Sequence, residues 1–180
     1  MASISHLAAG ALCGAIYARR TFASPLRSLA ATTAFAALAL APDLDFFVLA
    51  MGLDHTPLGH RKLTHSLPFA LVVGVLVGGL TGAKDKKALA CLLSVLALAS
   101  HGLLDAATAN GPGPQLLAPF SEAPIQFAWH PIPGTQFFQE YFTAAAVPVF
   151  AGEALWCLPF LAAAAWVFAG RDRGAKTRDV

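Results

Sequence analysis

Long apolar stretches separated by short polar segments form the dominant pattern of the chain. The apolar stretches extend from Ile4 to Ala18, from Ser28 to Ala50, from Leu67 to Leu80, from Ala88 to Ala107 and from Phe137 to Ala169. An α-helix needs about 20 apolar residues to cross the hydrocarbon core of a bilayer. The pattern therefore predicts an all-α, polytopic membrane protein, with about five transmembrane helices in a single domain that covers residues 1–180.

The first and the last apolar stretches are the least regular. Ile4 to Ala18 is short for a span, and Arg19 and Arg20 can extend its reach by snorkelling to the interface. Two acids and two prolines interrupt the last stretch: Glu140, Pro148, Glu153 and Pro159. It is therefore either one broken helix or a re-entrant segment followed by a span. Residues 109–136 are rich in Pro and Gly and are expected to form an irregular loop.

Composition narrows the classes of partner. The chain is 57% hydrophobic and 12% charged, with a formal net charge of +2. This charge is too small to indicate nucleic acid, so lipids are the expected partners. Cys13, Cys91 and Cys157 each lie alone inside an apolar stretch, which favours packing residues over a disulfide or a thiolate site.

Metal-capable side chains stand at the ends of the first four apolar stretches: His6, Asp43, Asp45, His60, His65, His101 and Asp105. His101 and Asp105 are four residues apart on a predicted helix, so they project from one face. A turn ahead of the third helix can bring His60 and His65 together, and a bend after Pro42 can direct both aspartates inward.

The distribution of Lys and Arg indicates which side of the membrane these groups face. Short cytoplasmic loops are enriched in basic residues. With five crossings and the N-terminus outside, ten of the twelve basic residues lie in the cytoplasm: Arg19, Arg20, Arg27, Lys84, Lys86, Lys87, Arg171, Arg173, Lys176 and Arg178. Residues 171–180 then form a basic cytoplasmic tail. The metal-capable groups all fall at the extracytoplasmic interface, and alternation of the crossings keeps them together in either orientation.

Four imidazoles and three carboxylates exceed the needs of a single tetrahedral zinc ion. They suit two metal ions about 3.5–4 Å apart, as used for in-line attack on phosphate esters. Zinc is the expected metal, with Mn and Fe as alternatives. We expect a bridging hydroxide as the nucleophile, Arg61 as the clamp for a phosphate oxygen, and Thr64 or Ser66 as the group that orients a ligand.

The same residues resemble a known family. The ordered set is His6, Pro42 to Asp45, His60 to Ser66, His101 to Asp105 and Gly113 to Ser121, and it is similar to the YdjM-type family of predicted inner-membrane metal-dependent hydrolases. The resemblance covers about Ser5 to Ser121, and little matches beyond it. It implies a bacterial inner-membrane protein with a His/Asp metal site. A distant similarity to zinc-dependent phospholipase C favours phosphoester chemistry on a membrane lipid or lipid-linked substrate.

Other interpretations of these residues stay open. A metal-ion transporter or sensor can use the same ligands, although the apolar cytoplasmic halves of the spans argue against an ion path. A purely structural polar cluster between helices is a further alternative, in which Arg61 pairs with Asp43 or Asp105. A zinc protease is disfavoured because the chain lacks HExxH. His55 and His130 are expected to be loop residues, and Glu140 and Glu153 either join helices or have a functional role.

Overall fold

Five helices build the protein, for which we describe a computed structural model covering residues 3–109, 111–134, 143–144 and 146–176. They are α1 (Ser3–Thr21), α2 (Pro25–Leu40), α4 (Leu67–Thr81), α5 (Lys87–Ala106) and α6 (Ala146–Lys176). Short elements lie between them: the 3₁₀ helix η1 (Ala41–Asp45), α3 (Phe46–Ala50), the 3₁₀ helix η2 (Leu63–His65), and the strands β1 (Thr108–Ala109) and β2 (Ile132–Pro133). The mostly helical class predicted from the sequence is confirmed.

Helix α1 lies at the centre of the bundle, where it packs against α2, α5 and α6, while α4 packs on α5. Buried residues of the core between α1, α2 and α5 include Tyr17, Phe35 and Leu93. Small residues allow the closest approaches, as is usual between membrane helices. A Cβ at Gly10 would collide with the backbone of α2, and one at Gly78 would collide with the backbone of α5.

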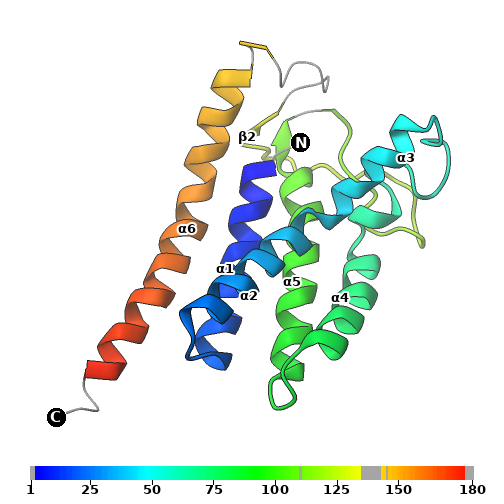
Figure 1. Cartoon of the computed structure of the whole chain (residues 1–180). Helices are drawn as coiled ribbons and strands as arrows, with labels where there is room; N and C mark the ends of the chain where they lie inside the picture. The colour runs from blue at the N-terminus through cyan, green and yellow to red at the C-terminus, as the bar shows by residue number, and fades with distance from the viewer. Residues whose placement is uncertain (1–2, 110, 135–142, 145, 177–180) are drawn as a thin grey trace.

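The chain alternates between the two ends of this bundle (Figure 1). The N-terminus, α3 and the segment that carries β1 and β2 gather at one end, and α6 ends at the other. The turns that join α1 to α2 and α4 to α5 lie at that second end as well. The start of α1, the end of α2, the start of α4 and the end of α5 therefore face one another.

Three helical stretches are long and apolar enough to cross a membrane by length and composition: Pro25–Ala50, Lys87–Ala106 and Ala146–Ala169. The apolar helix Leu67–Thr81 is shorter, with 15 residues. The stretch Pro25–Ala50 is not uniform, because it changes from α to 3₁₀ geometry at Ala41–Asp45. Pro42 lies in the first turn of η1, so the chain changes helical geometry at the place where a bend was expected.

In the second half of the chain, the last apolar stretch follows one of the two predicted alternatives, and the predicted loop contains a pair of short strands. From Ala146 onward, the last apolar stretch is one helix that contains Pro159; Glu140 lies outside the described residues. The loop expected at residues 109–136 is irregular through most of its described part, but its ends are joined, because Thr108–Ala109 pairs in parallel with Ile132–Pro133. This loop also reaches α6, where Trp129 contacts Trp156 edge to face.

Candidate metal centre

The seven metal-capable side chains come from four separate parts of the chain and meet at one end of the bundle. His6 projects from the first turns of α1, and His101 and Asp105 from the last turns of α5. Asp43 and Asp45 lie on η1, His65 on η2, and His60 in the segment before η2. Five of the seven side chains are buried: His6, Asp45, His65, His101 and Asp105.

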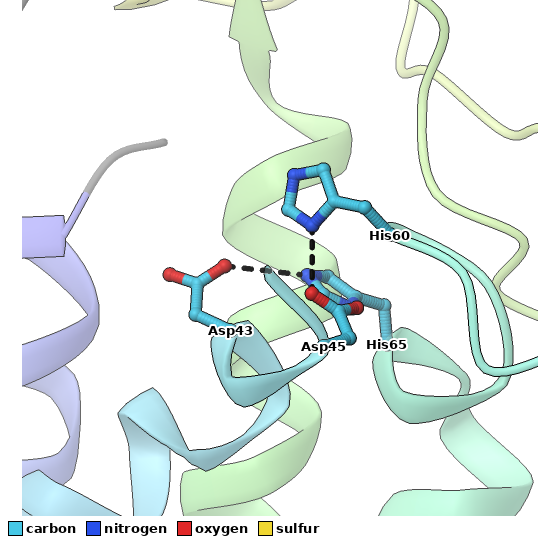
Figure 2. A group of neighbouring side chains, drawn as sticks. All are labelled: Asp43, Asp45, His60 and His65. Atoms are coloured by element: carbon cyan, nitrogen blue, oxygen red, sulfur yellow. Dashed lines mark hydrogen bonds and ion pairs between the residues drawn. The ribbon is translucent and has the colours of Figure 1, made fainter. Parts of the chain in front are cut away.

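The two aspartates of η1 contact the two ring nitrogens of His65, and each contacts one further histidine. Figure 2 shows Asp43 and Asp45 with dashed contacts to the two histidines of the adjacent segment. Asp43 Oδ1 lies 3.6 Å from His65 Nε2 and 3.4 Å from His101 Nε2. Asp45 Oδ1 lies 2.7 Å from His60 Nδ1, and its Oδ2 lies 3.1 Å from His65 Nδ1. Asp43 therefore links His65 to His101, and Asp45 links His65 to the partly exposed His60.

Three buried groups from η2 and α5 converge at the centre of the cluster. His65 Nε2 and His101 Nε2 are 3.1 Å apart, and Asp105 Oδ2 lies 3.4 Å and 4.0 Å from these two nitrogens. A glycine makes this approach possible, since a Cβ at Gly102 would collide with the carbonyl oxygen of His65. Gly102 was missed as a contributor to the site, although its place beside His101 in a helix was a visible signal.

His6 completes the cluster from α1. Its ring stacks on that of His101 with centroids 3.9 Å apart, and its Nε2 lies 3.4 Å from Asp105 Oδ1. Four buried atoms here have no hydrogen-bond partner among the described residues: His6 Nδ1, His6 Nε2, Asp43 Oδ2 and Asp105 Oδ1. Each buried polar atom left unpaired costs about 1–3 kcal/mol. Buried nitrogen and oxygen atoms that lack hydrogen bonds and converge on one region fit a bound cation.

The donor atoms form three overlapping groups in which each residue offers one ligand atom and all lie within 4.8 Å of one another. The first contains Asp43, Asp45, His60 and His65; the second contains His6, Asp43 and His101; and the third contains His65, His101 and Asp105. Imidazole nitrogen combined with carboxylate oxygen is a donor set typical of zinc, manganese and iron. The cluster can hold a metal ion by its chemistry and by its spacing.

Neighbouring groups orient several of these donors. His101 Nδ1 lies 2.7 Å from the carbonyl oxygen of Ala39, which only accepts hydrogen bonds, so Nδ1 carries the proton and Nε2 faces the cluster. The Thr64 hydroxyl donates to Asp45 Oδ2 at 2.8 Å and lies 3.1 Å from His65 Nδ1. Thr64 thus has the orienting position that we expected of Thr64 or Ser66. Ser66 instead caps α4 by accepting from the backbone N–H of Phe69.

Arg61 adopts a left-handed backbone conformation with φ of 64°, which costs a residue other than glycine about 1–2 kcal/mol. Its backbone N–H donates to Asp45 Oδ2 at 3.3 Å. Its side chain places Nε 3.6 Å from Asp105 Oδ2, and Nη1 donates to the carbonyl oxygen of Pro112 at 3.0 Å. The ion pair with Asp105, one of the alternatives left open by the sequence, is present in the structure.

His65 lies within 3.6 Å of all three carboxylates of the cluster: Asp43, Asp45 and Asp105. Burial lowers the pKa of His65, but hydrogen bonds with Asp43 and Asp45 and the negative charge of Asp105 outweigh burial. The net result is that the pKa of His65 is raised from 6.5 to about 9. Without a metal, a protonated His65 is therefore stabilised among the three carboxylates.

The structure leaves the remaining histidines away from the cluster. His55 is exposed, and His130 is exposed with Nδ1 3.2 Å from the carbonyl oxygen of Phe127. Glu153 on α6 is fully buried, and its Oε2 accepts from the backbone N–H of Ile4 at 3.3 Å. Glu153 therefore joins α6 to the first turn of α1, two residues before His6.

Comparison with known proteins identifies the family. A family model described as YdjM inner membrane protein matches residues 1–174. The chain belongs to this family. The match extends well beyond Ser121, where the resemblance seen in the sequence ended. The inner membrane protein YbcI of Escherichia coli (strain K12) is 34% identical over 124 residues, which cover 66% of this chain and 71% of YbcI. No solved structure matches the chain significantly. Family membership and the apolar helices indicate an inner membrane protein.

Proposed function

We propose that this YdjM-family chain is a membrane-bound, metal-dependent hydrolase that cleaves a lipid-borne phosphoester. The observation that carries the proposal is the convergence of buried imidazole and carboxylate donors, several of them without a hydrogen-bond partner among the described residues. Burying these groups is costly unless they are paired or bind a cation. If the cluster only joined helices, its buried polar atoms would be expected to form hydrogen bonds with one another.

The ligands proposed for the metal are His6, Asp43, Asp45, His60, His65, His101 and Asp105. Their number and the overlap of the three donor groups favour two ions, and zinc is the metal that best suits mixed His/Asp ligation. When bound, divalent ions supply Lewis acidity toward a phosphoryl group and activate water at neutral pH. Asp45 accepts a hydrogen bond from the Thr64 hydroxyl and contacts both His60 and His65. It would thereby hold the two imidazole rings in the orientation that metal binding requires.

Arg61 is proposed to bind the substrate. Its guanidinium is planar and suited to phosphoryl oxygens, and it is held at the edge of the cluster by Asp105. The contact between Nη1 and the carbonyl oxygen of Pro112 can be exchanged for a contact with a phosphoryl oxygen. Arg61 then contributes charge stabilisation where negative charge develops.

A lipid substrate follows from the proposed membrane arrangement. We place five crossings in the membrane with the N-terminus outside, so that the cluster faces the extracytoplasmic interface. Support comes from the end-to-end alternation of the helices and from the basic residues of the α1–α2 and α4–α5 turns, which lie at the opposite end. A phosphoester in the outer leaflet would then reach the cluster without leaving the interface.

The test combines metal analysis with hydrolysis. The detergent-purified protein should contain about two equivalents of zinc or manganese and should release phosphate or a phosphorylated headgroup from lipids. The double substitution His65→Ala, His101→Ala should abolish both, whereas His130→Ala, at an exposed histidine outside the cluster, should change neither. Metal uptake into proteoliposomes without hydrolysis would replace this proposal with metal transport. Folded protein without stoichiometric metal would overturn it altogether.

A further inference from the structure

A pocket of about 200 Å³ with a mixed polar and apolar lining lies on the segment that precedes Thr64. Lys62, His55, Gln115 and Glu122 supply its polar lining, and Leu63 and Ala118 are among its apolar residues. We propose that this pocket binds the zwitterionic headgroup of a lipid, with Lys62 contacting an anionic oxygen and Glu122 contacting an ammonium group. This proposal deepens and rests on the proposed phosphoesterase function, because it names the headgroup class that the site selects.

Lys62 is fixed in place but not neutralised. Its Nζ donates to the backbone carbonyl oxygens of Asp54, at 2.5 Å, and Thr56, at 3.2 Å. The Asp54 carboxylate faces elsewhere, since its Oδ1 accepts from the backbone N–H of His60 at 2.8 Å. Within the described residues, Lys62 forms no ion pair with a carboxylate. Carbonyl groups orient an ammonium without cancelling its charge, so the pocket retains a fixed positive group for an anion.

Glu122 supplies the opposite charge. It is exposed, it lines the same pocket, and in the described part of the chain it forms no ion pair with Lys62 or with another cation. A cation and an anion that share one pocket without pairing are complementary to a ligand that carries both charges. A purely anionic headgroup would meet Lys62 but would be repelled by Glu122.

The pocket is suited to a small headgroup. Its volume of about 200 Å³ admits a small ligand. This is enough for an anionic group with a short aminoalkyl arm. Leu63 and Ala118 offer apolar contact for that arm, and Gln115 adds an amide that can donate or accept.

The backbone connects the pocket directly to the metal centre. Lys62 and Leu63 lie between Arg61, which contacts Asp105, and Thr64, which contacts Asp45. The backbone N–H of Gln115 donates to the carbonyl oxygen of Arg61 at 2.8 Å. A headgroup held by Lys62 and Glu122 would thus lie along the chain segment that joins Arg61 to Thr64.

Calorimetric titration of the chelator-treated protein with short-chain phosphatidylethanolamine and phosphatidylglycerol tests this inference without requiring hydrolysis. We expect phosphatidylethanolamine to bind about fivefold more tightly, as one favourable exposed charge contact allows. Glu122→Gln should remove the preference, and Lys62→Met should weaken both lipids. Lys86→Met, at the far end of the bundle, is the matched control.

The outcomes separate this inference from the proposed function. Equal binding of the two lipids by the folded wild-type protein would overturn the headgroup pocket and leave the phosphoesterase proposal standing. Selective binding without hydrolysis in the metal-loaded protein would support the pocket and count against the phosphoesterase. Free phosphoethanolamine that binds as tightly as the lipid would overturn the lipid assignment in favour of a soluble zwitterion.

Discussion

The Nε2 atoms of His65 and His101 lie 3.1 Å apart, although 36 residues separate them in the chain. The proton of His101 is on Nδ1, where the carbonyl oxygen of Ala39 accepts it. The Nε2 lone pair of a neutral His101 is therefore directed at His65 and at the carboxylate of Asp43. A cation between these groups would satisfy the donors together.

Thr64→Val should weaken metal binding without removing a proposed ligand. The substitution deletes the hydroxyl that donates to Asp45 Oδ2 and keeps the shape of the side chain. Loss of a group that orients a ligand typically costs 10–100-fold in metal affinity, and we expect a change in this range, measured by competition with a chromogenic chelator. Thr64→Ser should restore most of the affinity. A Thr64→Val protein with wild-type affinity would show that Asp45 does not need this contact.

Arg61→Gly should lower hydrolysis while leaving the stability of the protein nearly unchanged. Glycine adopts positive φ without strain, so the substitution should recover about 1 kcal/mol of backbone strain at Arg61. It also removes the guanidinium contact with Asp105. We expect hydrolysis to fall at least 100-fold while the melting temperature stays within a few degrees of the wild type.

Arg61→Ala is the matched variant for this experiment, since it loses the guanidinium but keeps the strained backbone. It should melt at a lower temperature than Arg61→Gly and be equally inactive. If both variants retained full hydrolysis, Arg61 would be a structural partner of Asp105 and not a substrate clamp.

Glu153 should act on the metal centre through α1. Its carboxylate accepts from the backbone N–H of Ile4 at the start of the helix that carries His6. Glu153→Leu leaves that N–H without its acceptor, at a cost of about 1–3 kcal/mol, and should speed hydrogen exchange in the first turn of α1. Glu153→Gln keeps an acceptor oxygen and should exchange like the wild type. Equal exchange in Glu153→Leu and wild type would show that α1 does not depend on this contact.

The metal-free protein should lose stability as the pH rises toward 9. The folded pKa of His65, about 9, is above its ordinary value of 6.5. The stabilisation from protonated His65 is therefore complete below pH 6.5 and disappears as the pH rises through 9. Thermal melting with chelator should record this decline, and His65→Gln should flatten it. An unchanged slope in His65→Gln would assign the decline to other groups.

Much of the fold followed from short-range patterns in the sequence. Apolar stretches of sufficient length predicted the helices, because the helical period and the need to bury apolar side chains act locally. The spacing of His101 and Asp105 predicted one face of a helix, and Pro42 indicated where the α-helix gives way to the 3₁₀ turn that carries Asp43 and Asp45. Alternation of the helices then predicted that the polar residues gather at one end.

The tertiary structure alone decided which groups meet within that cluster. The stacking of His6 on His101, the contact of His101 with Ala39, and the pairing of His60 with Asp45 join elements that are distant in sequence. Such contacts depend on how closely whole helices pack, as at Gly102, and on the path of irregular segments, for which no periodic pattern exists. The sequence by itself determined which residues are available for metal chemistry; packing over long range determined their geometry.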